Sequence, residues 1–192
     1  MRLFVAVELP ALVRRDLGAL VERLRHTRAD VKWVEQENMH LTLKFLGEVE
    51  SDRLAPVQDA LRQAAGRVAP FRFTLGALGA FPSPRNPRVI WVGVCQGQPQ
   101  LASLAAEVER QLLPLGFAKE ERPFTAHLTL GRLRSPSPKG STGPRDLCAA
   151  LAAESVPPHT VAVDGFVLFQ SVLRGRGPVY TPLSAFPLSC AH

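Results

Sequence analysis

The chain has 192 residues, of which 46% are hydrophobic and 21% are charged. This length suits one domain, and the apolar fraction is too high for a disordered protein. No apolar run approaches the ~18 residues of a membrane-spanning helix, which excludes a membrane span. The first residues, MRLFVAVELP, include Glu8 and Pro10 and lack a small-residue cleavage site, so they indicate a strand and not a signal peptide.

The three cysteines, Cys95, Cys148 and Cys190, are odd in number and widely spaced, and no CxxC motif is present. Neither a disulfide framework nor a cysteine zinc site is therefore indicated. We expect buried or half-buried free thiols in a reducing cytoplasm.

The charge is unevenly distributed along the chain. Lys and Arg number 23 against 17 Asp and Glu, a formal net charge of +6. Acidic residues are absent from Ala60 to Ala106 and again from Arg122 to Arg145. Such asymmetry favours a polyanionic partner, with nucleic acid first, because the guanidinium fork matches phosphate geometry. A genome whose base composition favours arginine and proline codons would give the same pattern, so both interpretations stay open.

Hydrophobic periodicity predicts strands and helices in alternation through the first half of the chain. The apolar run Leu3–Val7 predicts a buried strand, and Pro10 opens a helix with a stripe of apolar residues at helical spacing. Two strands follow at Val31–Val34 and Met39–Leu46. Ser51 is a typical N-cap for the next helix.

The second half continues the alternation with more strands. We expect strands, in chain order, at Phe71–Phe81, Arg88–Val94, Thr125–Leu130, Val161–Phe169 and Val179–Phe186. A helix over Leu101–Leu112 and a short helix from about Pro144 to Ala153 complete the pattern, and the stretch Ser135–Pro144 predicts a mobile loop.

Consecutive strands are too frequent in this order for a wholly parallel sheet. The sequence therefore predicts an α+β fold, with antiparallel sheets and helices on their outer faces. No linker is long enough to separate two independent domains, so we expect residues 1–192 to form a single domain.

The tetrapeptide His-Leu-Thr-Leu occurs twice, at His40–Leu43 and at His127–Leu130. Each copy lies in an expected strand, where side chains alternate between two faces. In the first copy, alternation places the polar side chains opposite the apolar ones: His40, Thr42 and Lys44 against Leu41, Leu43 and Phe45. The second copy presents His127 and Thr129 together in the same way.

Two imidazoles and two hydroxyls suit in-line displacement at phosphorus. One histidine can take a proton from the nucleophile while the other gives a proton to the leaving oxygen. The hydroxyls of Thr42 and Thr129 can donate to non-bridging oxygens as charge develops. A single histidine on a polar strand face is more often a solvated side chain, but the repetition in an Arg-rich chain favours a catalytic pair.

Arg132 follows the second motif and could neutralise phosphate charge. Strict alternation turns it away from His127, whereas a bulge at Gly131 would turn it inward, and the sequence leaves both open. The H-x-T pattern is not a metal-ligand pattern, so we expect neither metal nor cofactor. Four aromatic residues are candidates for stacking a base, although the core is favoured for each of them: Phe45, Phe81, Trp33 and Tyr180.

The paired motifs resemble those of the 2H phosphoesterase superfamily. Their flanks are similar to its LigT-like branch, the RNA 2′,3′-cyclic phosphodiesterases, also called 2′-5′ RNA ligases. The similar stretches cover nearly the whole chain and read RLFVAVELP, HLTLKFLGEV, GAFPSPRNPRVIWVGV, ERPFTAHLTLGR and FQSVLRGRGPVY. Ala126 departs from the family, which usually has proline before the second histidine.

This resemblance implies a bilobal fold, in which two pseudo-symmetric antiparallel sheets contribute one motif each to a central cleft. It implies metal-independent opening of terminal 2′,3′-cyclic phosphates of RNA to 2′-phosphomonoesters. His40 is then the proton donor to the departing 3′ oxygen and His127 the proton acceptor from water. Thr42, Thr129 and Arg132 bind the phosphate, and the reverse reaction gives ATP-independent 2′-5′ ligation.

The expected partner is RNA with a 2′,3′-cyclic phosphate end, bound by a cytoplasmic monomer. One alternative is an RNA- or nucleotide-binding module of the same fold without significant turnover. A transesterifying ribonuclease ranks lower, because the sequence contains no evident base-reading element.

Overall fold

The computed structural model describes residues 1–134, 143–175 and 177–189. Its α-helices and strands follow one another in this order: β1 (Arg2–Glu8), α1 (Ala11–Arg25), β2 (Val31–Trp33), β3 (His40–Glu48), α2 (Leu54–Ala65), β4 (Phe71–Ser83), β5 (Asn86–Gln96), α3 (Gln98–Leu112), β6 (His127–Leu133), α4 (Gly143–Ala153), β7 (His159–Val163), β8 (Gly165–Arg174) and β9 (Gly177–Pro187). Short 3₁₀ turns lie at Gln36–Asn38, Ser51–Arg53 and Leu113–Leu115.

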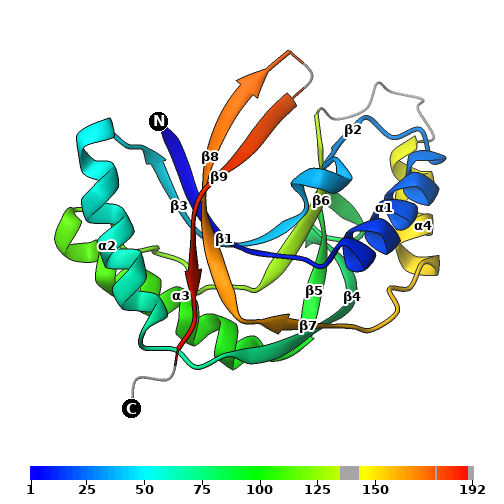
Figure 1. The fold of residues 1–192 in the computed structure, drawn as a ribbon. Coiled ribbons are helices and arrows are strands. Elements are labelled where there is room, and N and C mark those ends of the chain that lie inside the picture. The colour runs from blue at the N-terminus through cyan, green and yellow to red at the C-terminus, as the bar shows by residue number, and fades with distance from the viewer. Residues whose placement is uncertain (135–142, 176, 190–192) are drawn as a thin grey trace.

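The strands form two antiparallel sheets that diverge like a V (Figure 1). The first, sheet A, has the order β3-β1-β8-β9, and the second, sheet B, has the order β2-β6-β5-β4-β7. The two motif strands, β3 and β6, contact each other where the sheets meet. The α+β fold with antiparallel sheets is thus confirmed.

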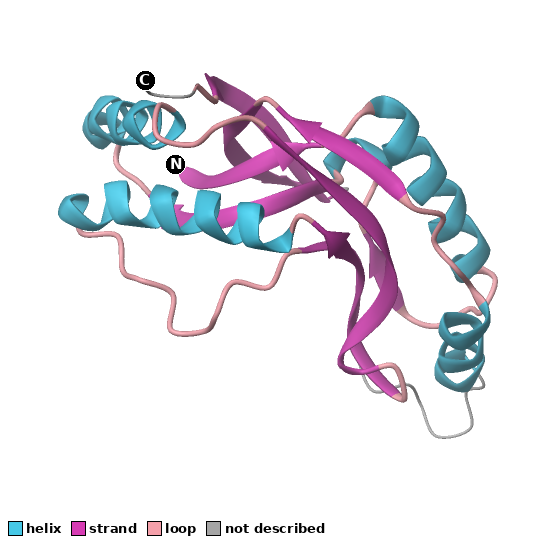
Figure 2. Ribbon diagram, turned by 90° about the horizontal axis from the view of Figure 1, so that it is seen from below, coloured by secondary structure: helices cyan, strands magenta, loops and turns pink. Residues whose placement is uncertain are grey.

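Helices cover only the outer face of each sheet (Figures 1 and 2). Helices α2 and α3 pack on sheet A, and α1 and α4 lie together beside sheet B. The opposite faces, called the inner faces below, are covered by no α-helix of the described residues. Side chains that recur every second residue on β1 show the division: Leu3, Val5 and Val7 join the main core under the helices, whereas Phe4 and Ala6 belong to a separate apolar cluster with Val167 and Phe169.

The two sheets repeat one pattern. The pairing of β3 with β1, of β1 with β8 and of β8 with β9 corresponds to the pairing of β6 with β5, of β5 with β4 and of β4 with β7. Two strands are exchanged in this pattern. β4, from the first half of the chain, lies in sheet B, and β8, from the second half, lies in sheet A beside β1. One continuous core joins both sheets.

The expected strand Val161–Phe169 is wrong in its extent. It divides at Asp164 into β7, at the edge of sheet B, and β8, in the middle of sheet A. A run that is apolar on both sides of one exposed residue gives no sign of a change of sheet. The loop expected at Ser135–Pro144 lies mostly outside the described residues.

Two smaller expectations can also be compared with the structure. Cys148 is half-buried, but Cys95, near the end of β5, is an exposed residue, so the expectation of burial is wrong there. Cys190 lies outside the described residues. Within the described ranges, no helix has the length and apolar character to cross a membrane.

Candidate active site

The two motif strands are held in place by their leucines. Leu41, Leu43, Leu128 and Leu130 are all buried in the main core. Each fully buried leucine contributes about 1.5–3 kcal/mol relative to an exposed one. The leucines therefore fix the orientation of the strands, and the alternate residues, His40 with Thr42 and His127 with Thr129, lie on the inner faces.

A β-bulge interrupts both motif strands at the same place. On β3, Lys44 pairs with Val5 but Thr42 pairs with Ala6, which leaves Leu43 without a partner. On β6, Gly131 pairs with Ile90 and Thr129 with Trp91. A bulge inserts one extra residue and resets the alternation of side chains. The residue five positions after each histidine therefore returns to the inner face.

The bulge corrects two expectations about the first motif. Lys44 does not share a face with His40; only 4% of it is exposed, on the helix-covered side of sheet A. Its ammonium donates to Glu109 Oε1 on α3 at 3.0 Å and to the Ala118 carbonyl at 2.9 Å. Phe45 is not a core residue, because 62% of it is exposed. Strict alternation failed because the extra residue shifts the phase by one.

The same bulge places Arg132 on the inner side of β6, exposed, in the position that corresponds to Phe45. Position 131 has no room for a larger residue, because a Cβ there would lie 2.6 Å from Val31 Cγ1 and 2.8 Å from Trp33 Cε3. Burial raises the pKa of Tyr180 on β9, and the charges of Arg2 and Arg132 partly oppose that rise. The cation of Arg132 therefore acts on a residue of the other sheet.

His40 lies in an aromatic enclosure on sheet A. Its ring stacks on Phe4, with ring centroids 4.7 Å apart, and Phe169 stacks on both rings, 5.2 Å from Phe4 and 6.2 Å from His40. The Tyr180 ring meets His40 edge-on at 5.2 Å. Burial among these rings lowers the pKa of His40 to about 4, although a hydrogen bond to the Asn38 backbone acts in the opposite direction. The imidazole is consequently neutral at pH 7 in the unliganded protein.

His127 has a different environment on sheet B. Its Nδ1 lies 2.7 Å from the Thr125 carbonyl oxygen, so Nδ1 carries the proton and donates it to that carbonyl. Nε2 is then the free acceptor nitrogen. The ring of Phe81, 37% exposed, meets His127 edge-on at 5.4 Å. Phe81 and Tyr180 thus flank the two histidines, while Trp33 is buried in the core as expected.

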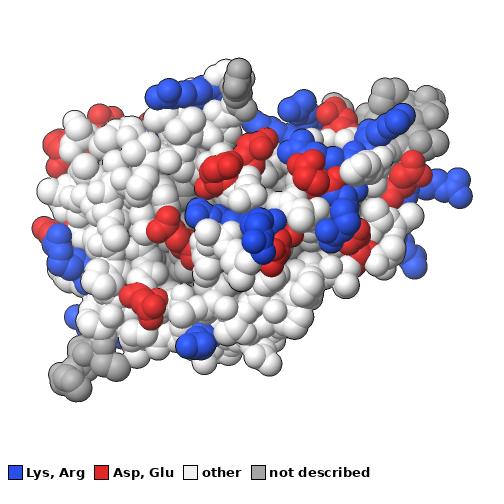
Figure 3. Space-filling model, turned by 45° about the vertical axis from the view of Figure 1, so that its right-hand side comes forward, with Lys and Arg blue, Asp and Glu red and all other residues white. Residues whose placement is uncertain are grey.

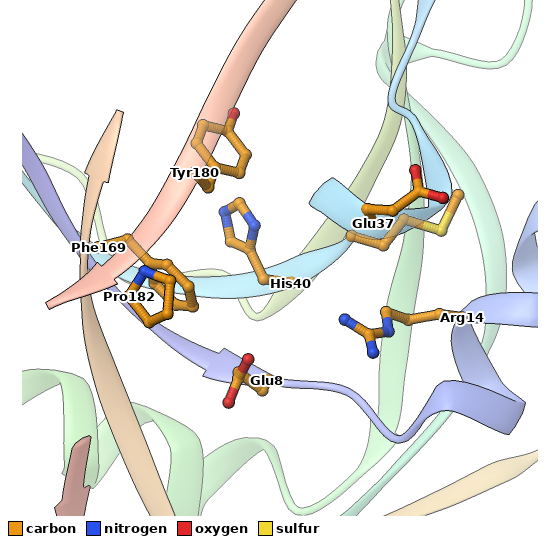
Figure 4. Close-up of a pocket in the computed structure, with 8 residues that line it drawn as sticks. Glu8, Arg14, Glu37, His40, Phe169, Tyr180 and Pro182 are labelled. Carbon is orange, nitrogen blue, oxygen red and sulfur yellow. The ribbon is translucent and has the colours of Figure 1, made fainter. Parts of the chain in front are cut away.

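A cavity of about 130 Å³ opens beside His40 (Figure 4). Apolar walls come from Met39, Phe169, Tyr180 and Pro182, and charged side chains come from three separate elements: Glu8, Arg14 and Glu37. The cavity lies at the Glu8 end of the β1–β3 pair, whereas Phe45 lies next to Phe4 toward the other end. None of the three charged residues was assigned to a site from the sequence, because they are separated along the chain and form no motif.

Charge on the outside of the molecule is mixed. Figure 3 shows basic and acidic side chains intermingled on the right-hand part of that face, with a largely uncharged surface on the left. On this face, therefore, the basic side chains do not form a continuous surface. Over the described residues, no three His, Cys, Asp or Glu side chains form a group that could hold a metal ion.

The pattern of a duplicated motif on paired strands matches a known family. The model of the family described as "LigT like Phosphoesterase" matches the chain twice, over residues 7–91 and 92–180. The chain belongs to the LigT-like phosphoesterase family. Each match contains one His-Leu-Thr-Leu motif, so the duplication seen in the sheets is also a duplication of the family unit.

Relatives of this LigT-like chain are similar over nearly their full length. The RNA 2′,3′-cyclic phosphodiesterase of Archaeoglobus fulgidus is 37% identical over 97% of this chain and 99% of the relative. The protein of the same name from Aeropyrum pernix is 39% identical, covering 87% of this chain and 92% of the relative. The Thermotoga maritima protein of that name is 33% identical over 95% and 93% of the two chains.

Solved structures agree with the LigT-like fold. The crystal structure of TT0787 from Thermus thermophilus has a TM-score of 0.77 at 33% identity, and the match covers 100% of both chains. E. coli LigT complexed with 3′-AMP has a TM-score of 0.71 at 31% identity, covering 98% of each chain. The two-sheet, bilobal architecture expected from the resemblance is therefore confirmed.

Proposed function

We propose that this LigT-like protein hydrolyses terminal 2′,3′-cyclic phosphates of RNA to 2′-phosphomonoesters. The observation that carries the proposal is the pair of H-x-T motifs on β3 and β6, which contact each other where the sheets meet, with all four polar side chains on the inner faces. The relatives named RNA 2′,3′-cyclic phosphodiesterase support the choice of substrate.

In this proposal His127 is the proton acceptor. Its Nδ1–H is bound by the Thr125 carbonyl, which leaves the Nε2 lone pair to take a proton from the attacking water. The general base must be neutral to do this, and a fixed tautomer supplies the free nitrogen at the inner face without reorientation.

His40 is the proposed proton donor to the departing 3′ oxygen. Its pKa of about 4 means that it must take up a proton when the substrate binds. An anionic phosphate beside the ring favours the imidazolium and raises that pKa. Once charged, His40 can give this proton to the departing alkoxide.

Thr42, Thr129 and Arg132 are proposed to bind the phosphate. The hydroxyls lie on the inner faces next to the histidines, and Arg132 reaches this region through the bulge at Gly131. Donors fixed in place stabilise the charge that develops on the non-bridging oxygens. Microscopic reversibility gives 2′-5′ ligation when a 5′-hydroxyl replaces water, without ATP and with the proton roles exchanged.

The chain is proposed to work on RNA ends as one bilobal domain of residues 1–192. The shared core and the exchanged strands support a single unit. Its monomeric state and its cytoplasmic location stay predictions.

The deciding experiment incubates the protein with a dinucleotide that ends in a 2′,3′-cyclic phosphate, in the presence of EDTA. Phosphorus NMR against authentic 2′- and 3′-monophosphates identifies the product. We expect the 2′-phosphate alone, because a ribose held in one orientation loses only one of its two phosphate bonds. A dominant 3′-phosphate contradicts the regiochemistry, dependence on added Zn²⁺ or Mn²⁺ contradicts the two-histidine mechanism, and binding without turnover favours the binding module.

A further inference from the structure

The cavity beside His40 contains three charged side chains that do not neutralise one another. Glu8 comes from the end of β1, Arg14 from α1 and Glu37 from the 3₁₀ turn before β3. Within the described residues, none of the three side chains has an ion pair or a hydrogen bond to another side chain. Figure 4 shows the Arg14 guanidinium directed into the space in front of His40 and Glu8.

The walls of the cavity define the shape of its ligand. Phe169, Tyr180 and Pro182 form one side (Figure 4), and Met39 also lines the cavity. Cavities for drug-sized ligands measure about 300–1,000 Å³, so a cavity of about 130 Å³ suits one flat ring system. Two carboxylates beside one guanidinium disfavour a second phosphate, but they suit a neutral group that carries both N–H donors and carbonyl acceptors.

The position of the cavity relates it to the proposed reaction, on which this inference rests. His40 lines the cavity and is also the proposed donor to the 3′ oxygen of the terminal ribose. The base on that same ribose is therefore the group nearest to the cavity. The opposite end of the inner face, at Phe45 and Arg2, stays open for the RNA chain that leads to the terminal nucleotide.

We propose that this cavity binds the 3′-terminal nucleobase and selects guanine over uracil. Guanine offers two adjacent N–H donors, N1 and N2, to a carboxylate of Glu8 or Glu37. Its O6 and N7 atoms are the acceptors that arginine recognises best, here from Arg14. Uracil offers one N–H donor between two carbonyl oxygens, and those oxygens face the carboxylates unfavourably.

The test measures kcat/KM for the 2′,3′-cyclic monophosphates of guanosine, adenosine, cytidine and uridine. We expect guanosine to exceed uridine by ~10-fold or more, the usual effect of a charge-assisted hydrogen bond. Glu37→Gln and Arg14→Gln should each reduce the guanosine value by ~10-fold and change the uridine value by less than ~3-fold. Glu8 is not substituted, because it is paired with His40 across the strands and would alter its titration.

Matched control variants lie within two residues of each tested position. Glu35→Gln and Arg15→Gln remove the same charges at exposed sites that do not line the cavity, so the base preference should not change. Equal rates on all four bases, or a Glu37→Gln variant that slows all four equally, overturns this inference and leaves the proposed function intact. No hydrolysis of any of the four overturns both.

Discussion

The strands β3 and β6 begin with the same four residues and contain the same bulge, yet their surroundings differ. His40 lies among Phe4, Phe169 and Tyr180, whereas His127 meets Phe81 and hydrogen-bonds to the backbone at Thr125. After the bulge, β3 presents an exposed aromatic ring, Phe45, and β6 presents a cation, Arg132.

The comparison separates what the duplicated scaffold supplies from what its neighbours supply. The buried leucines place an imidazole and a hydroxyl on the inner face of each sheet, and the bulge returns the fifth residue after each histidine to that face. The aromatic enclosure then makes one imidazole hard to protonate, while a backbone carbonyl fixes the tautomer of the other. Two identical motifs thereby acquire different proton-transfer roles.

Removal of either histidine is expected to have the largest effect. His40→Ala and His127→Ala should each lower kcat by ~10²–10⁴-fold, because each removes one proton transfer. Circular dichroism and thermal unfolding should show intact folding, since both side chains lie on an inner face. If either variant keeps wild-type turnover of a cyclic-phosphate dinucleotide, the paired mechanism is wrong.

The enclosure of His40 also predicts how stability depends on pH. Its pKa is about 4 in the folded protein and close to 6.5 when unfolded, so the unfolded chain binds the extra proton between these values. His40 therefore does not lower the free energy of unfolding above pH 6.5, and it lowers this free energy by up to ~3 kcal/mol as the pH drops toward 4. Urea unfolding of His40→Asn should show a shallower pH dependence. The exposed His26→Asn serves as the control, and an unchanged slope in His40→Asn contradicts the enclosure.

The next largest effect is expected on stability, at the buried residue that follows the bulge. This residue is Lys44 on β3 and Gly131 on β6. Burial alone raises the pKa of Glu109, but the backbone N–H of Glu120 and the Lys44 ammonium outweigh it and hold that pKa below its usual value. Lys44→Met should cost ~2–3 kcal/mol of unfolding free energy by leaving Glu109 without its cation. In the double variant Lys44→Met with Glu109→Gln the loss should be smaller than the sum of the two single losses. Additive losses indicate that the ion pair contributes nothing.

The exposed side of the bulge gives the smallest and most specific effects. Arg132→Ala should lower kcat/KM ~10-fold on mononucleotide and dinucleotide cyclic phosphates alike, because it removes a charge-assisted contact to phosphate.

Phe45→Ala should weaken the binding of the dinucleotide only, by ~1–2 kcal/mol, through loss of a stacking surface. Equal effects of Phe45→Ala on both substrates would place its ring at the terminal nucleotide.

Sequence reasoning found the α+β fold, most elements and the two motifs, because hydrophobic periodicity reports directly on burial. It failed at Lys44 and Phe45, since the bulge shifts the alternation by one residue and, on β3, no glycine marks it as Gly131 does on β6. It also missed Phe4 and Phe169. Both lie within apolar runs, where residues of the inner face cannot be told from residues of the core.

The exchange of strands between the two halves has a consequence for the integrity of the molecule. A fragment that ends near residue 91 keeps β1, β3 and β4, but β1 then lacks β8, and β4 lacks the second half of β5 and all of β7. Such a fragment can complete its sheets only with a second copy of itself. The chain thus has the architecture of a two-fold, strand-swapped dimer joined into one polypeptide. Its joining allows the two copies of the motif to diverge, which a true dimer of identical subunits forbids.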